Sequence, residues 1–473
     1  MPAEDPTPEL LSGWGRTNPT AARVLRPSDP KEVADAVGAG SGAGRLPDRG
    51  LIARGLGRSY GDAAQNAGGV VVDATALARI HAVDLAGATV VADAGISLDA
   101  LMRTLLPLGL FPAVTPGTRA VTLGGAIAAY IHVKNHHADG SLGEHVRSLV
   151  LHTPSGRRVV GPDAPAEAPE RELFWATVGG MGLTGIVTEA TVGMIPVETS
   201  RIRMDTERAS DLDDVLDRMT SGDAGYRYSV AWIDCLARGA RLGRSVLTRG
   251  DHAGLGDLGH LPAAERAAPG AALRFDARTR LAAPPWVPRG LLNRWSVAAF
   301  NEVWFRKAPR AERGRVVPLA AFFHPLDGLS GWNRIYGRCG FVQYQFVVPF
   351  GAEGTLRSVL ERLAGSGRAS FLAVLKRFGE ANPGYLSFPA PGWTLALDMP
   401  AGGAGLAGLL DGLDQLVVEA GGRVYLAKDS RLRPELVPAM YPRLDAWREV
   451  CARVDPGCRL RSDLSRRLRL RLR

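Results

Sequence analysis

The segment Arg54-Gly-Leu-Gly-Arg-Ser-Tyr-Gly-Asp62 decides the expected fold, together with Pro116-Gly-Thr-Arg-Ala-Val-Thr-Leu-Gly-Gly-Ala-Ile127 about sixty residues later. Glycine lacks a Cβ and adopts positive φ readily, so such segments let main-chain N–H groups approach a bound anion closely. A pair of them is typical of a cradle for the pyrophosphate of a dinucleotide. The second segment runs into His132-Val-Lys-Asn-His-His137, which adds polar side chains.

The residues around these segments predict alternating strands and helices. Residues 69–73 and 88–93 are short β-branched runs that indicate buried strands. Ser97 is expected to cap a helix that ends near Pro107, because an apolar face of leucine and methionine follows it. Residues 148–160 predict a hairpin with its turn at Pro154-Ser-Gly156.

A third glycine motif, Gly180-Met-Gly-Leu-Thr-Gly185, matches the GxGxxG pattern of a Rossmann nucleotide loop. That loop must follow a strand and open a helix. Here residues 186–192 are β-branched and continue as a strand. We therefore expect another close approach of the backbone to the cofactor rather than a Rossmann fold.

Length and composition indicate a globular protein of at least two domains. The 473 residues exceed what one hydrophobic core supports. Hydrophobic residues make up 46% and charged residues 22%, without an apolar run long enough to span a membrane. The N-terminus, Met1-Pro-Ala-Glu-Asp-Pro6, does not resemble a secretory signal, and the four cysteines form no CxxC pair. We expect a cytoplasmic or peripheral membrane protein in a reducing compartment, without a metal site.

The net charge of +9 raises the possibility of nucleic-acid or membrane binding. Much of the surplus is local, because residues 461–473 carry six arginines and one acid. The alternation in Leu468-Arg-Leu-Arg-Leu-Arg473 suits an edge strand or a contact with an anionic membrane. A solvated, frayed tail is the alternative.

Lysine is rare in this chain, with five among the 57 basic residues. Arginine stays charged, whereas burial can tune lysine towards neutrality, so each surviving lysine is a functional candidate. Lys134, Lys376 and Lys428 lie inside motif-like segments.

After Pro196 the glycine motifs stop and a second domain is expected. We predict a cofactor domain over residues 1–195, a substrate domain over 196–420 and a C-terminal segment, 421–473, that returns to the first domain. Residues 249–289 are rich in Gly, Ala and Pro and predict a mobile loop. Residues 341–349 alternate as a strand that places Gln343 and Gln345 on one face, and residues 393–398 form another strand.

Several segments, taken in their order along the chain, resemble the flavoprotein oxidases of the vanillyl-alcohol-oxidase (PCMH-type) superfamily. Within that superfamily they resemble the family of decaprenylphosphoryl-β-D-ribose 2′-oxidases. They are Gly13-Trp-Gly-Arg16, the two glycine segments, Lys134-Asn-His-His137, Leu173-Phe-Trp-Ala-Thr-Val-Gly-Gly180, Phe323-His-Pro-Leu-Asp327, Trp332-Asn-Arg334, Gln343-Tyr-Gln345 and Ala427-Lys-Asp-Ser-Arg431. The resemblance implies an α+β fold: a PCMH-type FAD-binding domain of two subdomains, plus an α/β substrate domain built on an antiparallel sheet.

By this resemblance, a defined set of residues contacts FAD: Ala53, Arg54, Gly55, Leu56, Gly57, Arg58, Ser59, Tyr60, Gly61, Asp62, Gly117, Thr122, Gly124, Gly125, His132, Lys134, Asn135, Val187 and Tyr425. Covalently flavinylated members carry histidine where this chain has Arg58. Because arginine cannot make that bond, the resemblance implies non-covalent FAD.

Oxidation of a secondary alcohol requires a group that accepts the hydroxyl proton. Lys428 is our candidate, because burial among cations lowers the pKa of a lysine. The alternative is a salt bridge from Lys428 to Asp429 or Asp398. Tyr60 either positions the sugar or packs, and His132 is a candidate for proton relay.

Lys134, Lys376 and Arg58 are candidates for a substrate phosphate, although Lys376 is equally compatible with a surface lysine. Gln343 and Gln345 are expected to bind the sugar or the flavin, or else to face outward. Thr394 and Ala396 complete the expected substrate set, standing where the family typically has asparagine and cysteine. Tyr130 and Val133 replace a small acid and a glycine, which predicts an altered substrate pocket.

The resemblance implies oxidation of the 2′-hydroxyl of a polyprenyl-phosphoryl-β-D-ribofuranose. This reaction is the first half of the 2′-epimerisation that makes the arabinose donor of the actinobacterial cell wall. An NAD(P)H-dependent short-chain reductase would complete the epimerisation. The alternatives are an FAD-dependent oxidase of a soluble sugar or alditol and a non-catalytic basic protein that binds membranes or nucleic acids. The glycine segments argue against the non-catalytic protein.

Overall fold

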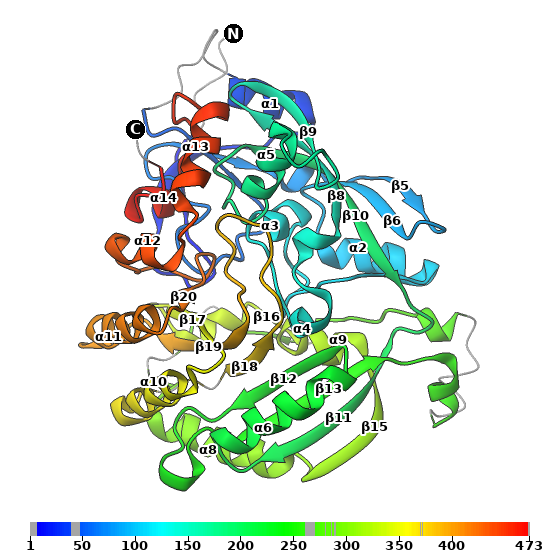
Figure 1. Cartoon of the computed structure of the whole chain (residues 1–473), viewed down its shortest axis with the longest axis vertical. Helices are drawn as coiled ribbons and strands as arrows, with labels where there is room; N and C mark the ends of the chain where they lie inside the picture. Colours follow the sequence, from blue (N-terminus) through cyan, green and yellow to red (C-terminus); the bar gives the residue numbers. More distant parts are fainter. Residues whose placement is uncertain are drawn as a thin grey trace.

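The computed structural model describes residues 7–38, 48–260, 270–279, 281–284, 286–287, 290–368, 370 and 372–471. In Figure 1 two small sheets and the C-terminal helices occupy the upper part of the molecule, and one large sheet fills the lower part. Among the described residues, no helix combines the length and apolarity that a membrane span needs.

The first small sheet has the order β1-β2-β4-β3 and delivers the first glycine segment. Its strands are β1 (Glu9–Leu11), β2 (Thr20–Leu25), β3 (Leu51–Arg54) and β4 (Val70–Asp73), parallel except for the β1/β2 pair. Helix α1 (Pro30–Gly38) buries Val33 and Val37 in the same core as β3 and β4. Because β3 ends at Arg54, the glycine loop begins at the carboxyl end of a buried strand.

The second sheet is antiparallel and carries the second glycine segment between its strands. Its order is β5 (Ile80–Asp84), β6 (Thr89–Asp93), β10 (Ile186–Pro196), β8 (Val146–Thr153) and β9 (Gly156–Val160), with β7 (Leu110–Pro112) paired to β10. Its helices are α2 (Leu98–Leu105), α3 (Leu123–Ala128), α4 (His136–Asp139) and α5 (Pro169–Thr177). The predicted cap is confirmed, because Ser97 accepts the Ala100 N–H. The β8/β9 hairpin is confirmed too.

The GxGxxG segment lies between α5 and β10, so a strand follows it, as predicted. Strand β10 is long, with eleven residues, and pairs with β6, β7 and β8. The Rossmann arrangement, in which a helix follows the glycines, is absent from this described segment.

An eight-stranded antiparallel sheet forms the lower part of the molecule. Its order is β15 (Ala311–Pro318), β11 (Arg201–Ala209), β13 (Ser245–His252), β12 (Tyr228–Ile233), β18 (Ala373–Phe378), β19 (Gly392–Pro400), β17 (Phe341–Pro349) and β20 (Arg423–Val424). Its helices are α6 (Leu212–Gly222), α8 (Arg294–Lys307), α9 (Leu319–Phe323), α10 (Glu353–Ser366) and α11 (Leu406–Glu419). The two predicted strands, 341–349 and 393–398, are confirmed as β17 and β19.

The expected mobile loop, 249–289, falls partly outside the described residues, which omit 261–269, 280, 285 and 288–289. Its first four residues belong to β13. Short 3₁₀ helices follow at Leu255–His260 and Ala271–Leu273, and the two-residue strands β14 (Leu281–Ala282) and β16 (Leu329–Ser330) pair in parallel. The three predicted domain ranges stay a prediction.

The C-terminal segment packs against the N-terminal sheet, and the expectation of an edge strand or a frayed tail is wrong for its described part. Helices α12 (Val437–Met440), α13 (Leu444–Val454) and α14 (Asp463–Arg467) lie beside the first two sheets (Figure 1). Leu468 and Leu470 are buried, and Arg471 binds Asp455 and the Leu183 carbonyl. Hydrophobic burial and ion pairing therefore occupy these residues, and Leu472 and Arg473 lie outside the described residues.

Candidate active site

A cavity of about 1030 Å³ separates the glycine segments from one face of the large sheet. Its volume lies at the upper end of the range for ligand pockets, which suits a dinucleotide together with a substrate. Most of the predicted site residues line it: Ala53, Arg54, Gly55, Leu56, Gly57, Arg58, Ser59, Tyr60, Gly117, Thr122, Gly124, Gly125, His132, Lys134, Val187, Gln343, Gln345, Lys376, Ala396, Tyr425 and Lys428.

The glycine cradle, which we define as residues 55–59 and 117–125, forms one side of the cavity. A Cβ on Gly55 would stand 2.1 Å from Thr122 Oγ1, so the two segments touch only because position 55 is glycine. Gly57 has a φ of +64°. A Cβ on Gly117 would meet no atom within 4 Å, which leaves this backbone open towards the cavity.

Main-chain donors in the cradle remain available. The N–H groups of Gly57, Arg58 and Ser59 donate to no acceptor in the described part of the chain. Residues 57–59 are half-buried at the wall of the cavity, so these N–H groups are free to donate to an acceptor bound there. The pyrophosphate of a dinucleotide supplies acceptors of this kind, and the cradle therefore fits FAD.

Segments far apart in the sequence hold the cradle in place. Trp14 N–H donates to the Ser59 carbonyl at 2.8 Å, and Tyr60 N–H donates to the Ala427 carbonyl at 3.0 Å. On the second glycine segment, Arg119 N–H donates to Asp327 Oδ2 at 2.9 Å. Several segments that carry the family resemblance thus converge on one site.

The sheet wall, the cavity-lining face of the large sheet, forms the other side. Every second residue on successive strands contributes: Met204 and Thr206 on β11, Val246 and Thr248 on β13, Val230 and Trp232 on β12, Val374 and Lys376 on β18, Ala396 on β19, and Gln343 and Gln345 on β17. This spacing follows from the two-residue period of a strand. The alternative that Gln343 and Gln345 face outward is therefore wrong.

Lys428 lies where the cradle meets the sheet wall. Its Nζ stands 3.8 Å from the centroid of the Tyr60 ring. Burial lowers the pKa of Lys428 to about 7; Asp398 opposes this shift and the charge of Lys376 adds to it. The amine therefore exchanges its proton near neutral pH.

Two carboxylates, those of Asp429 and Asp398, are the candidate salt-bridge partners of Lys428. Asp429 Oδ2 accepts from Arg467 Nη1 at 2.8 Å, so this residue has another partner. Asp398 Oδ1 accepts from Gln343 Nε2 at 2.5 Å, while its Oδ2 has no hydrogen-bond partner. Burial raises the pKa of Asp398 to about 7, against the opposing effects of Gln343 and Lys428. Asp398 thus influences Lys428 through space rather than in a direct pair.

Two further lysines reach the same cavity. Lys376 is on β18, and burial lowers its pKa to about 8. Its side chain lines the cavity, so the interpretation as a surface lysine is wrong. Lys134 Nζ donates to the Phe322 carbonyl and lies 4.1 Å from the Phe322 ring centroid. Burial lowers the pKa of Lys134 to about 7, and Lys376 adds to the effect.

His132 is held by protein partners on both ring nitrogens. Gln345 Nε2 lies 2.9 Å from His132 Nε2, and the Tyr130 carbonyl lies 3.4 Å from Nδ1. Burial, with a contribution from Lys376, lowers the pKa of His132 well below its ordinary value, so the ring is neutral. It then accepts from Gln345 and donates to Tyr130, an arrangement that orients Gln345 rather than leaving a free base.

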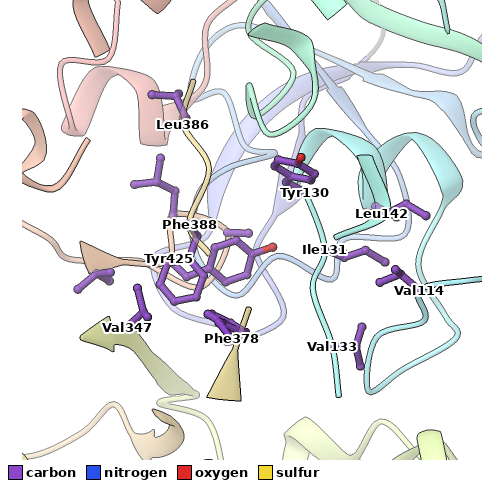
Figure 2. Close-up of a cluster of buried hydrophobic side chains, with 14 of the residues drawn as sticks. Val114, Tyr130, Ile131, Val133, Leu142, Val347, Phe378, Leu386, Phe388 and Tyr425 are labelled. Carbon is purple, nitrogen blue, oxygen red and sulfur yellow. The ribbon is translucent and has the colours of Figure 1, made fainter. Parts of the chain in front are cut away.

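Aromatic rings surround His132. The ring centroids of Phe378, Phe388 and Tyr425 lie 4.7 to 5.0 Å from that of His132. Figure 2 shows these three side chains as one group beside the segment of Tyr130 and Val133. The group excludes water from the imidazole and explains its lowered pKa.

The expectation that Tyr130 alters the pocket is wrong. Its φ is +47°, and its hydroxyl donates to Glu144 Oε1 at 3.1 Å. The ring packs where a Cβ on Gly143 or Gly384 would come within 2.7 Å or less of it. Tyr130 therefore lies outside the cavity lining, whereas Val133 belongs to it.

Four predicted site residues stand behind the lining, and each has a structural partner instead. Gly61 packs on the Asp429 backbone and Asp62 binds Arg467. Asn135 donates to the Ala113 carbonyl, and Thr394 Oγ1 accepts a hydrogen bond from Gln345 Nε2 at 3.4 Å. They support the site without facing the cavity.

Other residues that line the cavity have no recognisable sequence motif. Trp232 and Trp304 line the end of the cavity near α8, and Lys307 lies beside them. Isolated tryptophans have no distinguishing pattern, but the scarcity of lysine could have drawn attention to Lys307. The sequence indicates Asp398 only as a salt-bridge partner of Lys428, whereas the structure places it beside Gln343 in the site.

Comparisons with known proteins indicate the cofactor and the family of this chain. A family model described as an FAD binding domain matches residues 21–161. The chain is 47% identical over 465 residues to decaprenylphosphoryl-beta-D-ribose oxidase of Mycolicibacterium smegmatis, with 98% of each chain covered. It is 43% identical over 385 residues to a Streptomyces coelicolor protein named only for its place in the mprA 5′ region, covering 79% of this chain and 100% of the relative. Cytokinin dehydrogenase 8 of Oryza sativa is 31% identical over 204 residues, or 40% of this chain and 37% of that protein.

The fold and the cavity, taken with the matching FAD domain, define an FAD-dependent oxidoreductase. The sequence identity of 47% to the Mycolicibacterium enzyme, over 98% of both chains, identifies the family within this class of oxidoreductases. The chain belongs to the decaprenylphosphoryl-β-D-ribose oxidase family.

Proposed function

We propose that the chain oxidises the 2′-hydroxyl of a polyprenyl-phosphoryl-β-D-ribofuranose to the 2′-keto sugar. The observation that carries the proposal is Lys428, an amine of lowered pKa beside the glycine cradle in a single large cavity. The name of the Mycolicibacterium relative suggests the sugar and its lipid phosphate.

Lys428 is assigned as the proton acceptor. FAD, when bound, supplies the two-electron acceptor for the C2′ hydride. The neutral amine of Lys428 takes the hydroxyl proton as the ketone forms. Burial raises the pKa of Tyr60 well above its ordinary value, so its phenol stays protonated and its ring holds Lys428 in place.

The substrate phosphate is assigned to Lys376 and Lys134. Both line the cavity, and the contacts of their amines in the described part of the chain are with the Phe322 carbonyl and ring for Lys134 and with the Phe378 ring for Lys376. Burial disfavours the positive charge of these two amines, and the negative charge of a bound phosphate would compensate it. Gln343 and Gln345 are assigned to sugar hydroxyls, with His132 as the positioning residue for Gln345.

FAD is proposed to bind non-covalently. Among the described lining residues there is no cysteine, and His132 is the histidine present. Both of its ring nitrogens have protein partners. Arg58, at the position of the flavin-linking histidine in covalent relatives, lies 4.2 Å over the Trp14 ring. Acid precipitation of the yellow protein is expected to leave the flavin in the supernatant.

The 2′-ketone requires a second enzyme. An NAD(P)H-dependent reductase that delivers hydride to the opposite face of C2′ would give the arabinoside and complete the epimerisation. In this proposal the chain catalyses the first step of a route to the arabinose donor of the cell wall.

Anaerobic bleaching of the flavin tests the proposal. A short-chain polyprenyl-phosphoryl-ribose is expected to bleach the FAD-loaded protein, whereas free alditols leave it yellow. Bleaching by alditols alone would overturn the substrate assignment. A protein that cannot be loaded with FAD would overturn the enzyme assignment as well.

A further inference from the structure

Helix α8 exposes an apolar face at the lower end of the molecule, opposite α1 and α13 (Figure 1). Trp295 is 75% exposed, Val303 65%, Trp304 45% and Phe300 42%. Exposed apolar side chains that gather in this way mark interaction surfaces, whereas single ones carry no such meaning. Trp286, 72% exposed, precedes the helix.

The opposite side of α8 fixes the helix to the protein. Val297 and Asn301 are buried, and Asn301 Nδ2 donates to Asp234 Oδ1 at 2.7 Å. Glu302 forms an ion pair with Arg244, which lies outside the helix. The apolar face is therefore held outward by contacts on the other side of the helix.

The surroundings of this face are basic. Residues 290–310 contain Arg294, Arg306, Lys307 and Arg310 against one acid, Glu302, which gives a net charge of +3. Tryptophan beside arginine and lysine is the composition of helices that lie in the interface of an anionic bilayer. Each basic residue near such a surface adds to the attraction.

The same helix borders the active-site cavity. Trp304 and Lys307 line the cavity, and Trp232, Val230 and Val246 continue the lining along the sheet wall. Trp304, Trp232, Val230 and Val246 make this stretch of the lining mainly apolar, and Lys307 adds a positive charge to it. A lipid tail attached to a phosphate held by Lys376 has an apolar path towards α8.

We propose that the apolar face of α8, formed by Trp295, Phe300, Val303 and Trp304, docks the protein on an anionic lipid bilayer with the cavity opening at the membrane surface. The link to a lipid substrate rests on the proposed function, but the docking itself does not. The occupant is the bilayer because the face combines exposed indole rings with surplus positive charge.

Flotation with vesicles tests the docking on the FAD-loaded full chain. We compare wild type with the double variant Trp295→Gln/Val303→Gln, neither of which lines the cavity. The matched control is Leu85→Gln/Val159→Gln, two residues of 57% and 53% exposure on other strands and turns of the upper part. Vesicles contain equal parts of phosphatidylglycerol and phosphatidylcholine, or phosphatidylcholine alone.

Wild type and the control variant are expected to float with the anionic vesicles, and binding by the α8 variant falls about tenfold or more. Binding is expected to weaken in high salt and on phosphatidylcholine alone. Unchanged flotation of the α8 variant overturns the proposal. So does sedimentation analysis in which the α8 variant turns a dimer into a monomer, because the face would then be a subunit interface.

Activity separates this proposal from the function. Flavin reduction by a short-chain substrate in solution is expected to be the same for wild type and the α8 variant, whereas reduction by a long-chain substrate in vesicles falls with flotation. If neither substrate reduces the flavin but flotation behaves as described, the function is wrong and the docking stands. If the short-chain substrate works and flotation is unaffected by the substitutions, the docking is wrong.

Discussion

The glycine cradle and the sheet wall face each other across one cavity, yet they are built by different means. The cradle uses the backbone of two segments and depends on missing side chains, such as the Cβ that Gly55 lacks beside Thr122. The sheet wall uses side chains from seven strands between residues 201 and 400, with Glu312 and Arg315 contributed by β15. In the proposed function the backbone cradle holds the cofactor, and the wall of side chains, which can vary between relatives, selects the substrate.

The largest effect is expected where the two regions meet. Lys428→Met keeps the shape of the side chain and removes the amine, so flavin reduction should slow by about 10² to 10⁴ fold. FAD binding is expected to be unchanged. Stopped-flow absorbance measures the reduction, and Lys31→Met, the same change on a lysine that does not line the cavity, is the control. Normal reduction by an FAD-loaded Lys428→Met protein would remove Lys428 from the mechanism.

The cradle is tested by filling its open side. Gly117→Val places a side chain where no protein atom stands within 4 Å, so the fold is preserved while the cofactor space is reduced. FAD affinity should fall about 100-fold, which corresponds to roughly 2.7 kcal/mol. Fluorescence titration measures it, and Gly225→Val, an exposed glycine with equally free surroundings, is the control. Equal affinity of both variants would contradict the placement of FAD.

The C-terminal segment tests how the cradle is supported. Arg467 binds both Asp62 and Asp429, so Arg467→Met leaves two partly buried carboxylates without their partner. The free energy of unfolding should fall by about 2 kcal/mol. The control is Arg469→Met, because Arg469 is 70% exposed and its nearest ion pair spans 3.8 Å. Urea unfolding that gives the same value for both variants would show that the tail does not brace the first glycine segment.

The smallest effects are shifts in the pH profile of flavin reduction. The base must be neutral, so the rate is full above the pKa of Lys428, about 7, and falls as pH drops through it. Asp398→Asn removes a charge that raises this pKa and should move the acidic limb down by about one unit. Lys376→Gln removes a charge that lowers it and should move the limb up. Shifts in the same direction for both variants would contradict the assignment of the limb to Lys428.

The sequence predicted the cradle better than the wall for a physical reason. A backbone that approaches a ligand closely needs glycine at particular positions within one short segment. Residues 54–62 and 116–127 are therefore recognisable from the sequence without knowledge of the fold. The scarcity of lysine also worked, since Lys134, Lys376 and Lys428 all line the cavity. The same argument extends to Lys307, which also lines the cavity although no motif surrounds it.

Side-chain direction was the main source of error. Tyr130 follows a helix with a positive φ, and this backbone turn carries its ring away from the cavity into the space beside Gly143. The Leu/Arg alternation of residues 468–473 resembled an edge strand, but Leu468 and Leu470 are buried after a short helix. A two-residue period does not reveal which tertiary contacts are available.

Deuterium at a single carbon tests the central claim most directly. The FAD-loaded protein is mixed anaerobically with short-chain polyprenyl-phosphoryl-ribose carrying deuterium at C2′ or, separately, at C3′, and flavin reduction is followed by absorbance. We predict bleaching that is slowed by deuterium at C2′ and unaffected by deuterium at C3′. Bleaching slowed only by deuterium at C3′, or no bleaching by either sugar, would contradict the account.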